Sequence, residues 1–292
     1  MGPLLRSVAR RAALVTLLCV TGLGCARAPS PVHPGVGGSV GVPHGGVLAG
    51  GRELPRRGPG WVWLRGDDRH WGLPRFVDAI ERAARKVESQ RPGGTLSIGD
   101  LSVRRGGRLL PHLSHRTGRD VDLLLYMTTL EGAPVQSPGF IHVGADGLAY
   151  DEAGKRWLRL DVERTWLLVK ALVEDDAARV QWAFASTNLE AILLEWARAR
   201  GESGETLLRA SEILLQPRPG GVHDDHLHVR TACTPEEQAL GCEHTGPVRR
   251  WIAELDAATP TAPPSTEELL FAILSPIGAP EASAHAERHA AE

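Results

Sequence analysis

The spacing of apolar residues predicts several helices in the central part of the chain. Apolar positions recur with helical periodicity over residues 74–90, which predicts an amphipathic helix. A second helix is expected over 163–175. A third is expected over 191–199, because residues 187–190 have the Thr-x-x-Glu pattern of a capping box just before it.

Four short segments are expected to be strands: 95–98, 121–126, 180–184 and 227–231. Helices and strands do not follow one another in a regular β-α order, so the pattern indicates an α+β fold. Residues 58–256 are long enough for one domain with a substantial core.

Two strand segments carry polar residues at alternate positions. Side chains in a strand point to opposite faces in turn, so His226 and His228 would share one face while Leu227 points into the core. The same alternation would place Asp120 and Asp122 together on one side of their strand. The sequence therefore predicts a sheet with a polar wall of histidine and aspartate.

The segments that flank the domain have different compositions. Residues 1–28 have the charged-then-apolar order of a secretory signal peptide, and their apolar run is too short to span a membrane. Residues 29–57 are dominated by Gly, Pro and Val, which predicts a flexible linker. Residues 257–292 are rich in Ala, Pro and Thr and are expected to be weakly ordered, with 267–274 as a candidate short helix.

Cysteine use supports export. Cys19 and Cys25 belong to the leader, and Cys25 stands where a lipoprotein would be lipidated, while residues 26–28 offer an ordinary cleavage site. Both alternatives stay open. Cys233 and Cys242 would form a disulfide in an oxidising compartment; a zinc pair is the rival interpretation, but it lacks two further ligands nearby.

The overall charge excludes one class of partner. The chain has 33 basic and 35 acidic residues and a formal net charge of −2, so it lacks the excess of positive charge that is typical of DNA- or RNA-binding proteins. We expect no nucleic-acid partner.

Histidine and aspartate gather in two segments. Five of the 12 histidines lie in residues 112–115 and 223–228, and both segments have aspartates close by. Zinc binds imidazole nitrogen and carboxylate oxygen, and a catalytic site keeps three protein ligands and one water. Gly118 suits a turn that returns His115 over the strand of Asp122. The alternative is two half-exposed strands whose polar faces contain His and Asp without binding a metal, but two matching segments favour a zinc site.

These residues resemble a known family. The spacing His115-x-x-Gly118-x-x-x-Asp122 followed by His226-x-His228 is similar to the zinc signature of D-alanyl-D-alanine metallopeptidases and hedgehog-like domains. The penicillin-insensitive murein endopeptidases are more similar still, because they add histidines that correspond to His112 and His223. The resemblance includes residues 97–100 and 106–108 and extends from about residue 60 to 242, with no match in 128–179 or after 250.

The resemblance implies roles for individual residues. The fold would be a central antiparallel sheet flanked by helices, of the hedgehog and D-alanyl-D-alanine peptidase type. His115, Asp122 and His228 would bind Zn²⁺, and His226 would be the catalytic acid or base. His112 and His223 are expected to lie beside the metal ligands or to contact substrate. Asp120 and Asp225 are expected to orient imidazoles by accepting hydrogen bonds from them. Arg230 would either pair with a substrate carboxylate or be a surface charge.

The implied function is cleavage of peptide cross-links in bacterial cell-wall murein, of the D-alanyl-diaminopimelate type. Penicillin would not inhibit it, since no Ser-x-x-Lys with Lys-Thr-Gly accompanies the site. Two alternatives stay open. One is a D-alanyl-D-alanine carboxypeptidase or dipeptidase, and the other is a non-catalytic zinc-containing domain that binds the cell wall. The expected location is the periplasm, with or without a lipid anchor on Cys25.

Overall fold

The computed structural model describes residues 37–217, 220–258, 266 and 270. The predicted signal peptide, Cys25 and most of the predicted C-terminal tail lie outside these residues. Among the helices described, none is both long and apolar enough to cross a membrane.

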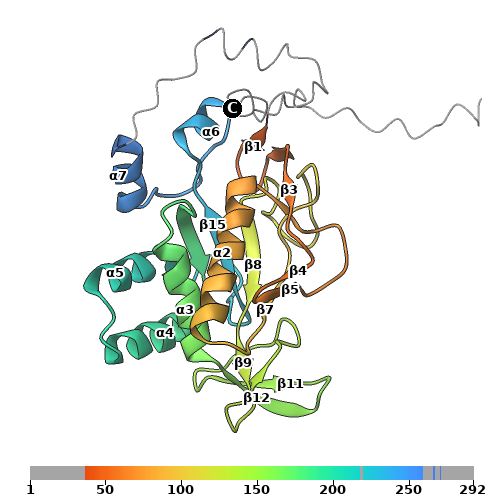
Figure 1. The fold of residues 1–292 in the computed structure, drawn as a ribbon. Helices are drawn as coiled ribbons and strands as arrows, with labels where there is room; N and C mark the ends of the chain where they lie inside the picture. Colours follow the sequence, from red (N-terminus) through yellow and green to blue (C-terminus); the bar gives the residue numbers. More distant parts are fainter. Residues whose placement is uncertain (1–36, 218–219, 259–265, 267–269, 271–292) are drawn as a thin grey trace, which may run out of the picture. The chain divides into compact units, whose positions relative to one another are not determined.

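The fold contains a mixed sheet of seven strands (Figure 1). The strands lie in the order β14-β13-β15-β8-β7-β5-β4. The pairs within β13-β15-β8-β7 are antiparallel, whereas β5 with β7 and β13 with β14 are parallel. The predicted α+β class is confirmed, and the antiparallel centre has parallel neighbours that were not predicted. The strands are β4 (Arg57–Gly58), β5 (Trp61–Trp63), β7 (Leu96–Ile98), β8 (Asp120–Leu124), β13 (Val180–Phe184), β14 (Leu214–Leu215) and β15 (His226–Thr231).

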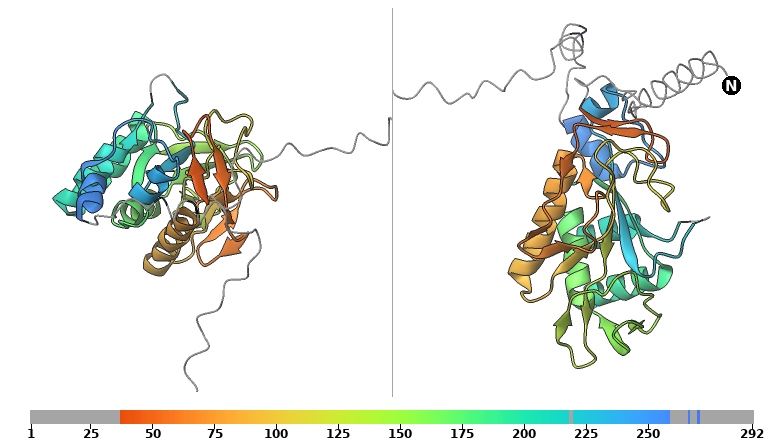
Figure 2. Two further views of the ribbon diagram at one scale, coloured as in Figure 1. Left: turned by 90° about the horizontal axis from the view of Figure 1, so that it is seen from above. Right: turned by 90° about the vertical axis from the view of Figure 1, so that its right-hand side faces the viewer.

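Helices α2 and α3 lie against one face of this sheet (Figure 2). The sheet residues on that face, such as Val121 and Leu227, are buried in one core with Phe76 of α2 and Trp166 of α3. Burial of this apolar face orients the polar residues between them toward the opposite face. The helices are α2 (Pro74–Gln90), α3 (Val162–Val173), α4 (Thr187–Ala199), α5 (Gly204–Ile213), α6 (Pro235–Ala239) and α7 (Arg250–Ala258).

Side-chain caps set where the helices begin. Asp161 caps α3 by accepting a hydrogen bond from the backbone N–H of Arg164. The cap of α4 is Ser186, which accepts from Leu189 N, so the predicted cap at Thr187 is wrong by one residue. Both residue types accept such bonds, and only the backbone shows that Ser186 has the extended conformation of an N-cap.

A smaller sheet follows β8 and has the order β10-β9-β12-β11. The predicted strand 121–126 is two residues too long, since β8 ends at Leu124, and β9 of the second sheet begins only at Met127. None of the strands of this sheet was predicted. They are β9 (Met127–Thr128), β10 (Pro134–Val135), β11 (Leu148–Asp151) and β12 (Arg156–Leu160).

The predicted flexible linker is wrong for residues 37–57. This segment contains β1 (Gly38–Val40), β2 (Val47–Ala49) and β3 (Arg52–Glu53), and its residues Leu48 and Leu54 are buried. Strand β3 pairs with β6 (Trp71–Gly72). The glycines here permit close packing rather than flexibility: a Cβ on Gly46 would lie 2.0 Å from the carbonyl oxygen of Val40.

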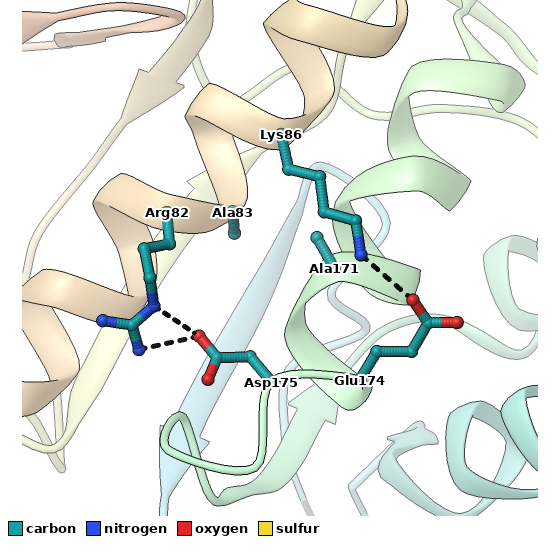
Figure 3. Close-up of a pocket in the computed structure, with 6 residues that line it drawn as sticks. All are labelled: Arg82, Ala83, Lys86, Ala171, Glu174 and Asp175. Carbon is teal, nitrogen blue, oxygen red and sulfur yellow. Dashed lines mark hydrogen bonds and ion pairs between the residues drawn. The ribbon is translucent and has the colours of Figure 1, made fainter.

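Two ion pairs join α2 to the end of α3 across a groove of about 310 Å³ (Figure 3). Arg82 Nε lies 2.8 Å from Asp175 Oδ2, and Lys86 Nζ lies 3.0 Å from Glu174 Oε2. Partly exposed pairs contribute about 0.2–1 kcal/mol each. Because these charges pair with one another, the groove offers little to a charged ligand.

The predicted disulfide between Cys233 and Cys242 is present, and it closes the loop that follows β15. Arg75 of α2 reaches the same loop, with Nε 2.7 Å from Glu237 Oε1 and Nη2 2.7 Å from Glu237 Oε2. The end of the central strand is therefore attached to α2 by a bidentate ion pair and by hydrogen bonds from Arg75 to Thr231 Oγ1 and to the carbonyl oxygen of Ala232.

Replacing both Cys233 and Cys242 with Ser should lower the free energy of unfolding by about 2 to 3 kcal/mol, the chain-entropy value for a loop of about ten residues. Urea denaturation under non-reducing conditions measures it. Wild-type protein in reductant should match the variant. Free thiols at both positions in protein taken from the cell envelope would contradict the assignment.

Candidate metal centre

The candidate site lies on the polar face of β8 and β15. These strands pair antiparallel, with His228 opposite Asp122 and Arg230 opposite Asp120. Val121 and Val229, which alternate with them, are completely buried in the core on the other face. The polar wall expected from the alternation is therefore present, and pairing in this register brings the side chains of both strands together.

His115 reaches this face from a turn before β8. It has a backbone φ of 61°, and Gly118 beyond it has a φ of 69°. A Cβ on Gly118 would lie 2.8 Å from a methyl carbon of Leu48, so the chain needs glycine here both for its angle and for its space. The ring Nδ1 of His115 lies 2.6 Å from the carbonyl oxygen of Leu101, which fixes the ring toward Asp122.

Three potential ligand atoms converge on one point. His115 Nε2 lies 3.3 Å from Asp122 Oδ1, His228 Nδ1 lies 3.0 Å from the same oxygen, and the two nitrogens are 3.2 Å apart. Two ligands about 2.0–2.2 Å from a tetrahedral zinc ion are separated by about 3.3–3.6 Å. The triangle is slightly compact for that ion but has the right scale.

The hydrogen bonds of the two rings decide which nitrogens face the centre unprotonated. His115 Nδ1–H donates to Leu101 O, and His228 Nε2–H donates to Asp120 Oδ1 at 3.1 Å. The inward nitrogens then carry lone pairs and face a carboxylate oxygen. The other oxygen of Asp122, Oδ2, is buried without a hydrogen-bond partner among the described residues. Three mutually repelling acceptors require a proton or a cation between them.

The pKa values of the buried groups reflect this need for a positive charge. Burial by itself would raise the pKa of Asp122, but the charge of His115 and hydrogen bonds from the surrounding histidines outweigh it and hold the pKa well below its usual value. Burial would lower the pKa of His228, yet hydrogen bonds to Asp120 and Asp122 raise it.

Asp120 and Arg230 form the layer behind His228. Arg230 Nε lies 2.6 Å from Asp120 Oδ1, and burial of Asp120, which would raise its pKa, is outweighed by this charge and by His228, so the pKa is lowered. Only 8% of Arg230 is exposed, and its Nη1 bonds to Thr245 Oγ1. The side chain is thus not the surface charge considered from sequence, and its ion pair holds Asp120 in place.

His226 lies at the open edge of the centre. Its Nδ1 is 2.5 Å from Asp225 Oδ1, and its Nε2 is 3.4 Å from Asp122 Oδ1. The ring meets Phe140 edge-on, with 5.1 Å between the ring centres. The side chain is 14% exposed, compared with 0% for His115, so solvent or substrate can reach His226 but not His115.

His112 and Asp100 border the centre on the other side. His112 Nε2 lies 2.7 Å from Asp100 Oδ2, and its ring lies 4.2 Å from that of His115. Asp100 also forms ion pairs with two arginines: its Oδ2 lies 3.2 Å from Arg69 Nη1 and 3.6 Å from Arg65 Nη1. Asp100 and the two arginines were given no role from sequence, because they come from loops whose approach to the centre leaves no periodic pattern.

His223 stands at the mouth of a cavity next to the centre. The cavity has a volume of about 240 Å³ and is lined by His142, Gly221, Val222, His223, Asp224 and Asp225. His223 Nδ1 donates to Gly221 O at 2.8 Å, and its ring centre is 5.1 Å from that of His226. Burial lowers the pKa of His223, which favours a neutral ring. The loop thus brings an uncharged imidazole beside His226.

The side chains form two separate groups that could each hold a metal ion. One contains His112, His115 and Asp122, and the other contains His223, His226 and His228. The predicted ligand set takes members from both groups, and its three atoms are the ones that converge within 3.0–3.3 Å. Every site residue expected from sequence lies in this cluster or in direct contact with it.

The metal-free protein should become less stable as the pH rises above neutrality. Burial would lower the pKa of His226, but hydrogen bonds to Asp122 and Asp225 raise it from 6.5 to about 9. A raised folded-state pKa gives stability that is complete below about 6.5 and is lost as the pH rises through about 9. Thermal unfolding in chelator across this range measures the loss. His226→Gln should flatten the pH dependence, and an unchanged dependence in this variant would contradict the assignment.

Comparison with known proteins shows the family to which this chain belongs. A family model described as penicillin-insensitive murein endopeptidase matches residues 39–251, which includes the segment 128–179 and begins before residue 60. A protein of that name from Haemophilus influenzae is 27% identical over 222 residues, 75% of this chain and 71% of the relative. One from Salmonella heidelberg is 29% identical over 216 residues, 72% and 71% of the two chains. One from Klebsiella pneumoniae is 35% identical over 120 residues, 39% and 43%. The chain belongs to the penicillin-insensitive murein endopeptidase family of peptidases.

Proposed function

We propose that this protein is a zinc-dependent endopeptidase that hydrolyses D-alanyl-diaminopimelate cross-links in bacterial murein. The observation that carries the metal assignment is the convergence of His115 Nε2, Asp122 Oδ1 and His228 Nδ1, each held by its own partners. The curated relatives named murein endopeptidase support the substrate. Zinc fits a set of two imidazoles and one carboxylate that leaves a fourth position for water.

When bound, zinc polarises the scissile carbonyl and acidifies a water molecule, which makes a nucleophile available near neutral pH. His115, Asp122 and His228 hold the ion, and Arg230 keeps Asp120 charged so that Asp120 accepts the outer N–H of His228. These buried contacts fix the tautomer and orientation of the ligands before any substrate binds.

His226 is the proposed acid/base group. Asp225 accepts its Nδ1–H, so Nε2 is the nitrogen available for proton exchange on the side of the metal centre. When Nε2 is unprotonated it can take a proton from the attacking water, and the protonated ring can then give that proton to the leaving amine. The partial exposure of His226 supports this role over that of a fourth ligand, since a structural zinc site would enclose the ion in four protein ligands.

His112 and His223 border the substrate path. His223 is uncharged and lines the adjacent cavity, and because its Nδ1–H donates to Gly221 O, its Nε2 can accept a hydrogen bond from a substrate N–H. His112 bonds to Asp100 and packs on His115, which places it between the metal ligands and the exposed loop with Leu110 and Leu113. Both contribute to binding more than to the transfer of protons.

Export to the periplasm belongs to the same proposal. Murein lies outside the cytoplasmic membrane, and the Cys233–Cys242 disulfide suits an oxidising compartment. Residues 1–28 would be a signal peptide. Lipidation of Cys25 or cleavage after residue 28 are alternatives that the mass of the mature N-terminus distinguishes.

Metal removal should abolish murein cleavage. A chelator followed by dialysis should stop the conversion of cross-linked fragments to fragments without the cross-link, and added Zn²⁺ should restore it, because no protein nucleophile replaces the metal-activated water. Benzylpenicillin should leave the rate unchanged. Activity that survives complete removal of metal, or covalent labelling by penicillin with loss of activity, would overturn the proposal.

Alanine variants should separate metal binding from chemistry. Replacement of His115, Asp122 or His228 removes one of three ligands, so zinc content and activity should fall together. His226→Ala should keep most of its zinc yet lose about 10²-fold to 10⁴-fold in rate, the range for a positioned acid or base. Elemental analysis beside the cleavage rate gives both quantities.

Two further variants serve as comparisons in that series. His112→Ala and His223→Ala should lose about 10-fold to 100-fold, as typical for groups next to a metal site. Loss of zinc from His226→Ala as complete as from His228→Ala would make His226 a ligand instead. Full activity in every variant would remove the metallopeptidase hypothesis.

A further inference from the structure

Two aromatic side chains stand exposed and adjacent on the four-stranded sheet. Tyr150 of β11 is directly opposite Trp157 of β12, and their ring centres are 5.2 Å apart. Trp157 is 54% exposed and Tyr150 is 37% exposed. Large aromatic side chains are usually buried, so a paired exposure of this kind indicates a binding surface.

The packing of the fold does not account for this pair. Ala149 and Leu158, the alternate residues of the same two strands, are buried against the core. The outward side of the hairpin presents Leu148, Tyr150, Trp157 and Arg159, which we call the aromatic face. Residues directly opposite in a ladder share a face, so these four side chains form one continuous strip.

The hairpin that carries the aromatic face is rigid. Asp151 Oδ1 accepts from Gly154 N at 2.9 Å, and Asp151 Oδ2 accepts from Arg156 Nε at 3.1 Å. A Cβ on Gly154 would lie 2.4 Å from Asp151 Oδ2, so glycine is needed to close the turn. A surface held in this way loses little conformational entropy when a ligand binds.

The aromatic face belongs to the same region as the metal centre. Arg159 pairs with Thr128 in the second sheet. Thr128 follows Asp122 by six residues, so the chain limits the distance between Thr128 and Asp122 to about 20 Å. The connection from β10 to β11 also carries Phe140, which contacts His226. A polymer whose peptide lies at the metal centre can therefore reach the aromatic face along its length.

We propose that the aromatic face binds the glycan strand of murein, while the attached peptide occupies the metal centre. This inference rests on the proposed murein substrate. The C–H faces of pyranose rings pack against indole and phenol rings, and the Tyr150 hydroxyl can bond to sugar hydroxyl or acetamido groups. Arg159, on the same face, can pair with a carboxylate of the peptide stem.

The size of the face favours a sugar polymer over a folded protein. Two partly exposed aromatic rings offer on the order of 200 Å², whereas a stable protein interface covers about 800 Å² on each partner. A short row of sugar rings needs only a narrow strip. Leu148 and Arg159 extend that strip on one side of the aromatic pair.

Binding of glycan strands stripped of their peptides tests the proposal without any cleavage. Wild-type protein should bind such strands in a calorimetric titration, and Trp157→Ala should weaken binding about ten-fold or more, as for a central aromatic contact. Trp157→Phe should retain most of the affinity. Leu208→Ala, which removes an equally exposed apolar side chain (48%) on α5, is the matched control and should bind like wild type.

A second readout compares insoluble murein with a soluble cross-linked peptide that carries no sugar. For Trp157→Ala, the ratio of the two cleavage rates should fall about ten-fold, because only murein offers the glycan. The proposed peptidase activity can fail while glycan binding persists, so the two hypotheses fail separately. The inference is overturned if wild-type protein does not bind the stripped strands, if Trp157→Ala binds them equally, or if sedimentation shows a dimer that Trp157→Ala dissociates.

Discussion

The antiparallel register of β8 and β15 is the constraint on which the site depends. It places His228 opposite Asp122 and Arg230 opposite Asp120, while the valines and leucines between them enter the core. A slip by one residue would reverse both faces, burying the ligands and exposing the apolar residues. The same hydrophobic burial that stabilises the sheet therefore also determines the geometry of the metal centre.

The two buried carboxylates of this site need positive charges close to them. Asp120 and Asp122 are fully buried carboxylates, and unpaired charges in that environment are costly. Arg230 compensates Asp120, whereas Asp122 has one oxygen close to three imidazoles and the other without a hydrogen-bond partner among the described residues. The proposed cation would supply the missing positive charge among these fully buried polar groups.

Sequence reasoning worked where side chains follow the periodicity of an element. Alternation placed His226 with His228, and the strand at 180–184 matches β13. It failed where geometry depends on tertiary contacts: the glycines of residues 37–57 suggested flexibility, although they permit close packing. Asp100 and Phe140 approach from loops and carry no periodic signal. The α4 cap was misplaced by one residue because Ser186 and Thr187 have the same capping chemistry.

Anomalous X-ray scattering at the zinc absorption edge, from crystals of protein loaded with Zn²⁺, tests the central claim most directly. The account predicts one strong peak about 2.0–2.2 Å from His115 Nε2, Asp122 Oδ1 and His228 Nδ1, with His226 Nε2 outside the coordination sphere. A peak held by His223, His226 and His228 instead, or no peak in the cluster, would contradict it.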